Sequence, residues 1–166
     1  SELRDDVLSK HDCFTVGETV FITPETALSY IAEDRRELDM VFQFDHMNAD
    51  CHLVKWFRKP FRPINLKRPL SRWQNALKGK GWNSLYLENH DQSRSLSRFG
   101  SPLWRNESAK MLATMIYFQQ GTPFLYQGQE IGMVNGDFAS LDDYRDVETK
   151  NMYVTGRKLL HFTHER

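Results

Sequence analysis

Four short apolar segments recur along the chain, and each one ends in polar or charged side chains. They cover residues 13–18, 39–44, 84–88 and 123–127. Each has the length of a buried strand and is too short for an ordinary helix. The pattern predicts four β-strands.

Apolar residues at helical spacing lie between these segments. A helix is expected to begin at Thr23 and to run to about Arg35, because threonine is a good N-cap and Pro24 suits the first helical position. Two further helices are marked by apolar residues three or four positions apart, which are Leu70, Trp73 and Leu77 in one and Ala109, Leu112, Ala113 and Ile116 in the other. Glycine is expected to end each of them, at Gly79 and Gly121.

Strands that alternate with helices are typical of parallel βαβ units with right-handed crossovers. We therefore predict an α/β fold for one domain, residues 1–166. A complete eight-stranded barrel takes about 250 residues, so four strands correspond to a (β/α)₄ half-barrel, and an open four-stranded sheet also fits. Residues 46–68 are interpreted as a long loop over the site, and residues 136–166 as a tail that is helical in parts.

The composition narrows the choice of partners. Lysine plus arginine and aspartate plus glutamate both number 22, so the formal net charge is zero. Nucleic acids and membrane surfaces require a basic excess, and neither is expected as a partner. Cys13 and Cys51 form no disulfide framework and fit no zinc pattern. With a charged N-terminus and no apolar stretch of about 18 residues, the sequence predicts a soluble, cytoplasmic protein.

Polar side chains at the ends of the predicted strands carry the candidate chemistry. The carboxyl ends of parallel strands meet at one edge of the sheet, where α/β barrels place their active sites. Carboxylates and a histidine gathered there suggest acid–base chemistry on a polar substrate. The 11 phenylalanines, 6 tyrosines and 4 tryptophans fit either core packing or platforms for sugar rings. The strand-end groups are Glu18, Asp45–His46, Asn89–Asp91 and Glu130.

Each of these groups also has a purely structural interpretation. Glu18 follows a glycine and is either a partly buried general acid or a loop acid. Asn89–Asp91 is either a functional cluster or a turn, since asparagine and aspartate favour turns. Asp45–His46 fits an ion pair or a ligand contact, and no metal site or cofactor is predicted. Near the C-terminus, His161 and His164 would share a helix face or belong to a solvated tail.

Taken together, the motifs resemble the α-amylase superfamily, and within it the oligo-1,6-glucosidase and α-glucosidase branch. The resemblance covers nearly the whole chain, with the motifs in the family's order. It implies a TIM (β/α)₈ barrel of which this chain holds strands five to eight. The motifs that carry it are Val16–Glu18, Phe42–His46, Asn89–Gln92, Ser97–Gly100, Lys110–Ala113, Gly121–Met133 and Asp143–Glu148.

The resemblance also implies roles for seven residues. Glu18 matches the general acid/base, and Asp91 the carboxylate that stabilises the transition state. The remaining positions match substrate contacts. His90 lies beside the same glucose unit as Asp91, Asp45 and His46 face the aglycone side, and Arg94 and Arg98 line outer subsites.

Some features depart from the pattern of the family. Ser93 stands where many relatives have proline, and Asp45 and Gln129 stand where glutamate is common. The shorter Asp45 leaves the linkage preference open. In this family the nucleophilic aspartate lies at the end of the fourth strand, upstream of Glu18. The resemblance therefore implies that the isolated chain lacks the nucleophile and is inactive.

The sequence thus predicts part of a retaining α-glucosidase that hydrolyses terminal α-glucosidic bonds of small oligosaccharides. Trehalose-6-phosphate hydrolase and sucrose isomerase are alternatives of the same kind. A non-catalytic half-barrel that binds sugar or only self-associates is the alternative from another class. Residues 13–18 and 123–127 would form open sheet edges, and we expect a homodimer through them.

Overall fold

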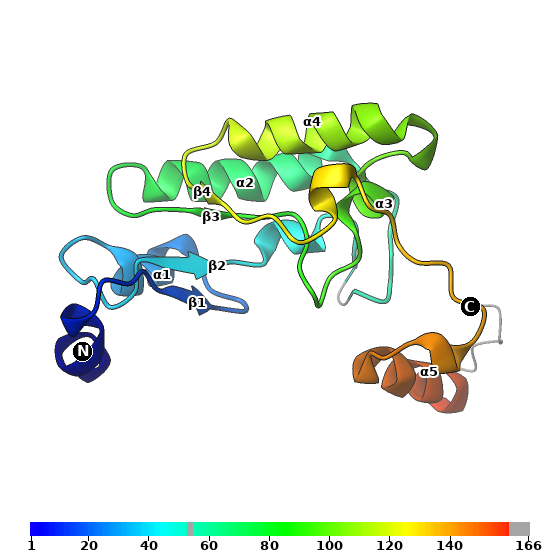
Figure 1. Cartoon of the computed structure of the whole chain (residues 1–166), viewed down its shortest axis with the longest axis horizontal. Coiled ribbons are helices and arrows are strands. Elements are labelled where there is room, and N and C mark those ends of the chain that lie inside the picture. The colour runs from blue at the N-terminus through cyan, green and yellow to red at the C-terminus, as the bar shows by residue number, and fades with distance from the viewer. Residues whose placement is uncertain (53–54, 160–166) are drawn as a thin grey trace. The chain divides into compact units, whose positions relative to one another are not determined.

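The computed structural model describes residues 1–52 and 55–159, so His161 and His164 lie outside the described residues. The chain divides into two units, residues 1–134 and 135–166. All four strands and the main helices belong to the first unit (Figure 1). None of the described helices has the length and apolar character needed to cross a membrane.

The strands form two parallel pairs. β1 (Val16–Glu18) pairs with β2 (Met40–Phe42), with Val16 opposite Met40 and Glu18 opposite Phe42. β3 (Ser84–Leu85) pairs in parallel with β4 (Thr122–Pro123). The predicted parallel direction is confirmed within both pairs. The ladders are shorter than the predicted segments: three residues pair between β1 and β2, and two between β3 and β4.

Two hydrogen bonds from side chains to backbone carbonyls join the β2 segment to the β3 segment. The Ser84 hydroxyl donates to the Val41 carbonyl over 2.6 Å, and the Tyr86 hydroxyl donates to the Gln43 carbonyl over 2.7 Å. Both contacts advance along the two segments in step, so β2 and β3 run in the same direction. The described strands therefore lie next to one another in chain order.

The helices follow the predicted pattern with different bounds. Thr23 caps α1 (Pro24–Ile31) by accepting a bond from the Thr26 amide, as predicted, but the helix ends earlier than Arg35, since Ala32 is extended. α4 (Arg105–Tyr117) also lies where helical spacing predicted it, but it ends at Tyr117 and not at Gly121 as expected.

The prediction of a loop over residues 46–68 is wrong in two places. η3 (Asp45–Asn48) forms one turn of 3₁₀ helix. α2 (Pro63–Leu77) starts well before Leu70, with proline at its first position, where the missing N–H costs nothing. Shorter turns complete the first unit: η1 (Leu3–Val7), η2 (Leu8–Lys10), α3 (Ser95–Phe99), η4 (Pro102–Trp104) and η5 (Gln129–Ile131).

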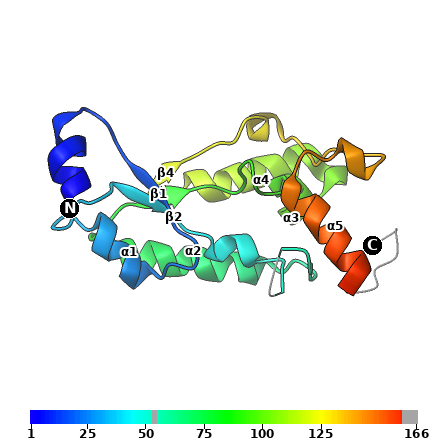
Figure 2. The same cartoon turned by 90° about the horizontal axis from the view of Figure 1, so that it is seen from below.

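Two apolar clusters form the core of the first unit. One joins α2, α3, α4 and the β3 segment, and it includes Leu70, Leu87 and Leu112. The other joins α1, β2 and α2 through residues that include Val41 and Trp73. Because α2 contributes to both clusters, it connects the two halves of the unit; it lies beside α4 in both views (Figures 1 and 2).

The second unit contains η6 (Leu141–Asp143) and α5 (Val147–Leu159). Ser140 and Asp143 form a capping box at the start of η6. The Asp146 carboxylate accepts a bond from the Thr149 amide over 2.8 Å at the start of α5. The prediction of a partly helical tail is confirmed for its described part.

Candidate active site

A pocket of about 240 Å³ lies at the carboxyl ends of the strands. Glu18 ends β1 and Phe42 ends β2, while the segments that follow β3 and β4 complete the wall. The structure therefore brings Glu18 and His90 together, as their positions after parallel strands predicted. The lining residues are Glu18, Phe42, Phe44, Tyr86, Glu88, Asn89, His90, Phe124, Leu125 and Tyr126.

Aromatic rings make up much of this pocket. The Phe42 ring meets Tyr86 and Phe124 edge to face, with centroid separations of 5.2 and 4.7 Å. Trp73, in contrast, is buried in the core. The aromatic residues thus supply both core packing and the wall of a pocket. Rings at the pocket offer flat apolar surfaces to whatever occupies it.

Glu18 is exposed, so the partial burial expected for its carboxyl is wrong. The physical reason is that β1, among the described strands, is paired on one side only. His90 and Asp91 are exposed as well, with His90 Nε2 3.3 Å from Asp91 Oδ2. The Asp91 amide donates to Asn89 Oδ1 over 2.9 Å, so this segment forms a turn and also presents His90 to the pocket.

Asp45 lies outside the pocket lining and faces α2. Its Oδ2 accepts a bond from Trp73 Nε1 over 2.8 Å and lies 3.8 Å from Arg72 Nη1. These contacts hold the carboxylate against the helix. Its proposed aglycone contact would therefore compete with bonds that the chain already makes.

His46 is buried, with 1% of its surface exposed, and also lies outside the pocket lining. Its Nε2 donates to the Tyr86 carbonyl over 2.8 Å, and its Nδ1 accepts a bond from the side-chain nitrogen Nε2 of Gln43 over 2.9 Å. Burial lowers its pKa to about 4, and the nearby Arg98 charge acts in the same direction. The neutral His46 ring, with both of its nitrogens hydrogen-bonded, joins the segment after β2 to the β3 segment.

This burial makes stability depend on pH. The unfolded ring takes up a proton near pH 6.5 and the folded ring only near pH 4, so the unfolded state binds more protons between these values. We expect the free energy of unfolding to fall by roughly 3 kcal/mol on account of His46 as pH drops through this window. Urea titrations at several pH values would measure it. The His46→Gln variant should lose this pH dependence of stability, and the control variant His52→Gln, at an exposed histidine, should keep it. If the unfolding free energy of both variants changed equally with pH, His46 would not be the group responsible.

Arg98 is a buried structural residue in this chain. Its guanidinium donates to the Asp50 carboxylate and to the Met47 carbonyl, and its side chain is 3% exposed. Burial alone would raise the pKa of Asp50, but the Arg98 bond and charge, together with the Arg58 charge, hold it below its usual range. The pair fastens the segment after β2 to α3.

Arg94, unlike Arg98, contacts two residues that line the pocket. Its Nη1 donates to Glu88 Oε1 over 2.8 Å, and its guanidinium lies 4.9 Å from the centre of the Tyr126 ring. Glu88 and Tyr126 both line the pocket. Glu88 is the residue that sequence reasoning missed, although it is an acid at the end of a buried run, just as Glu18 is.

The described residues contain no group of three or more histidine, cysteine or acidic side chains arranged for a metal ion.

Comparison with protein families shows to which family the chain belongs. The family model for the catalytic domain of alpha amylase matches residues 1–162. The chain belongs to the α-amylase family.

Individual members of the α-amylase family show the same relationship. The chain is 54% identical to an oligo-1,6-glucosidase of Parageobacillus thermoglucosidasius over 92% of its length, and it spans 27% of that protein. The crystal structure of trehalose-6-phosphate hydrolase from Bacillus licheniformis matches 92% of the chain, with a TM-score of 0.86 and 47% identity, across 28% of its own length.

An isomaltulose synthase from Klebsiella sp. LX3 matches 99% of the chain with a TM-score of 0.91 and 34% identity, and the chain covers 30% of it. The fold is therefore part of the catalytic α/β barrel of the α-amylase family.

Proposed function

We propose that this chain is strands five to eight of a retaining α-glucosidase barrel, which acts on terminal α-glucosidic bonds of small oligosaccharides. The observation that carries the proposal is the pocket in which Glu18 and His90 meet among aromatic rings. Relatives named oligo-1,6-glucosidase, about half identical to the chain, support this substrate class.

In the proposed reaction Glu18 is the general acid/base. It donates its proton to the glycosidic oxygen as that bond breaks, and its carboxylate later removes a proton from the attacking water. Asp91 and His90 bind sugar hydroxyls and stabilise the positive charge that develops on the ring. Arg94 and Arg98 border the outer subsites. Asp45 and His46 border the aglycone side. In this chain Arg98 and His46 act indirectly, because they hold the segments that surround the pocket.

A retaining enzyme also needs a nucleophilic carboxylate about 5–5.5 Å from the acid. Glu88 is the other carboxylate that lines the pocket, but both of its oxygens accept bonds from other groups. The resemblance to the family assigns the nucleophile to the fourth strand. We therefore propose that the isolated chain does not turn over glucosides and becomes competent when the remainder of the barrel is supplied.

Trehalose 6-phosphate is the second candidate substrate. The structural match to a trehalose-6-phosphate hydrolase at 47% identity favours it. A phosphate would need cations near the pocket, and the basic residues after β2 are partly committed, since Arg58 pairs with Asp50 and Lys55 lies 5.2 Å from the Trp56 ring centre. The α-glucoside without phosphate therefore remains the first choice.

A hybrid protein tests the proposed function. The matched segment of the Parageobacillus thermoglucosidasius oligo-1,6-glucosidase is replaced by this chain, and glucose release is measured with isomaltose, nitrophenyl α-glucoside and trehalose 6-phosphate. We expect activity on the first two, and none from the isolated 166 residues. A hybrid that folds cooperatively but hydrolyses none of the three would refute the proposal.

Self-association is proposed for the isolated chain. β1 has one paired edge among the described strands, and apolar side chains near it are exposed, including Phe14 at 67%. Unpaired edges and apolar patches favour pairing with a second chain. Sedimentation should show a dimer or larger species, and Phe14→Glu should shift it toward monomer while Leu103→Glu on η4 should not. A monodisperse monomer at high micromolar concentration would exclude this.

A further inference from the structure

Glu88 is a buried carboxylate placed directly before the turn that carries His90 and Asp91. Its side chain is 1% exposed. Oε2 accepts a bond from the Ser95 amide, and Oε1 accepts one from Arg94 Nη1. A buried charge is costly unless it is paired and hydrogen-bonded, so these bonds must form for Glu88 to stay in place.

Arg94 continues this chain of contacts to the segment after β4. Its Nη1 also donates to the Gln127 carbonyl over 2.6 Å, and its guanidinium lies over the Tyr126 ring. Glu88 and Arg94 thus tie the turn that carries His90 to the segment that carries Tyr126. His90 and Tyr126 line the same pocket, so this connection fixes one part of the pocket wall relative to another.

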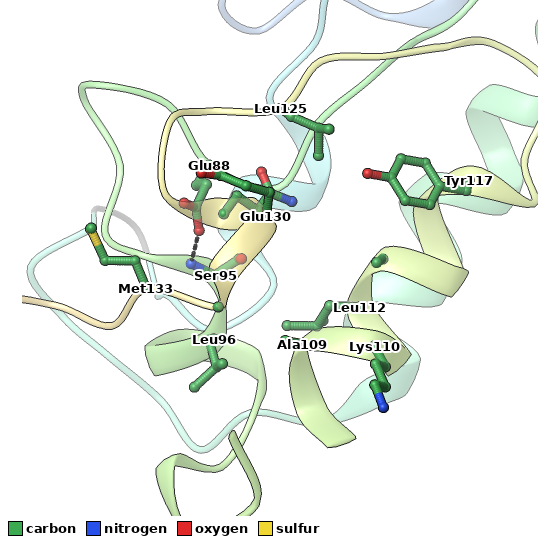
Figure 3. Close-up of a pocket in the computed structure, with 13 residues that line it drawn as sticks. Glu88, Ser95, Leu96, Ala109, Lys110, Leu112, Tyr117, Leu125, Glu130 and Met133 are labelled. Carbon is green, nitrogen blue, oxygen red and sulfur yellow. Dashed lines mark hydrogen bonds between the residues drawn. The ribbon is translucent and has the colours of Figure 1, made fainter. Parts of the chain in front are cut away.

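Glu88 lines both this pocket and a second cavity of about 220 Å³. Figure 3 shows that cavity, with Glu88, Leu125 and Glu130 on one side and Tyr117 projecting from α4 on the other. Empty space behind a side chain removes packing contacts that would otherwise hold it. The position of Glu88 therefore depends on its two bonds, of which Figure 3 shows the one to Ser95.

We infer that Glu88 is a positioning residue for the glucosidase reaction, which acts through Arg94 to hold the His90–Asp91 turn against the Tyr126 segment. The inference rests on the proposed function for its effect on turnover, and on the structure alone for its effect on the two segments. Glu88 itself contacts no reacting atom in this assignment.

Hydrogen exchange of the isolated chain tests the structural part. Glu88→Gln removes the charge and keeps the shape, so amides of residues 89–94 and 126–128 should exchange about tenfold faster. Amides of α2 should be unchanged. Glu107→Gln, an exposed acid on α4, is the matched control. Unchanged exchange in both segments would overturn the inference, and faster exchange throughout would show a general loss of stability instead and equally overturn it.

The hybrid enzyme tests the catalytic part. Because misplaced catalytic groups reduce turnover more than binding, Glu88→Gln should lower kcat on isomaltose by about 10- to 100-fold while KM changes less than about threefold. Arg94→Met should have a similar effect, the double variant should add little to either, and Glu88→Asp should recover part of kcat. Unchanged kcat in a folded Glu88→Gln hybrid would refute the inference and leave the proposed function intact. If the parent hybrid itself is inactive, the proposed function fails, and the exchange experiment decides the role of Glu88.

Discussion

Replacing Glu18 by glutamine in the hybrid enzyme is expected to lower kcat on isomaltose by about 10²–10⁴-fold, the usual contribution of general acid–base catalysis. Glutamine has nearly the same shape and cannot donate the proton that the leaving oxygen needs. A substrate whose leaving group needs no proton, such as dinitrophenyl α-glucoside, should lose far less in its first step. Initial rates on both substrates measure the difference.

Glu33→Gln provides the matched control, because Glu33 is an exposed glutamate after α1. It should leave kcat on both substrates unchanged. The role of Glu18 would be wrong if its glutamine variant kept more than about a tenth of the activity on isomaltose, or if both substrates lost activity equally.

Arg98→Met is expected to cost the isolated chain about 3 kcal/mol of unfolding free energy. The substitution removes the cation that balances Asp50, whose side chain is 7% exposed, and it leaves the Met47 carbonyl without this donor. Arg58 still pairs with Asp50, which limits the loss. Urea unfolding followed by circular dichroism would measure it.

Two comparisons sharpen this expectation. Arg35→Met breaks an ion pair in which Arg35 is 54% exposed, and it should change stability by less than about 1 kcal/mol. Arg98→Met combined with Asp50→Leu should recover part of the loss, because no unpaired carboxylate then remains buried. A single Arg98→Met variant as stable as Arg35→Met would show that the buried pair is unimportant.

The sequence was sufficient for the features that depend on local pattern. Thr23 with Pro24 predicted the start of α1, and helical spacing placed α4, because caps and apolar periodicity act over a few residues. The start of α2 was missed because the prolines and basic residues of 46–68 were interpreted as loop signals, although the buried stripe of α2 already begins at Leu66 and continues at Leu70. Strand lengths were overestimated, since an apolar run does not show which of its residues pair with a neighbouring strand.

For the candidate site, too, the sequence could predict some features and not others. The convergence of Glu18 and His90 follows from parallel strands and could be predicted. The direction in which Asp45 and His46 point could not be, because it depends on Trp73 and Tyr86, which are distant in sequence. Glu88 carried a visible signal, a carboxylate at the end of a buried run, but its partners Arg94 and Ser95 appear only in three dimensions.

The two thiols of the chain differ in reactivity because of where they lie. Cys51 is buried, and burial together with the neighbouring Asp50 charge raises its pKa, so little of the reactive thiolate forms at neutral pH. Cys13 is exposed just ahead of β1. A maleimide dye should therefore attach at Cys13 alone in the folded chain. A fluorophore at that thiol would stand beside the edge of β1 that pairs with no other described strand, and it would report directly when another polypeptide covers that edge.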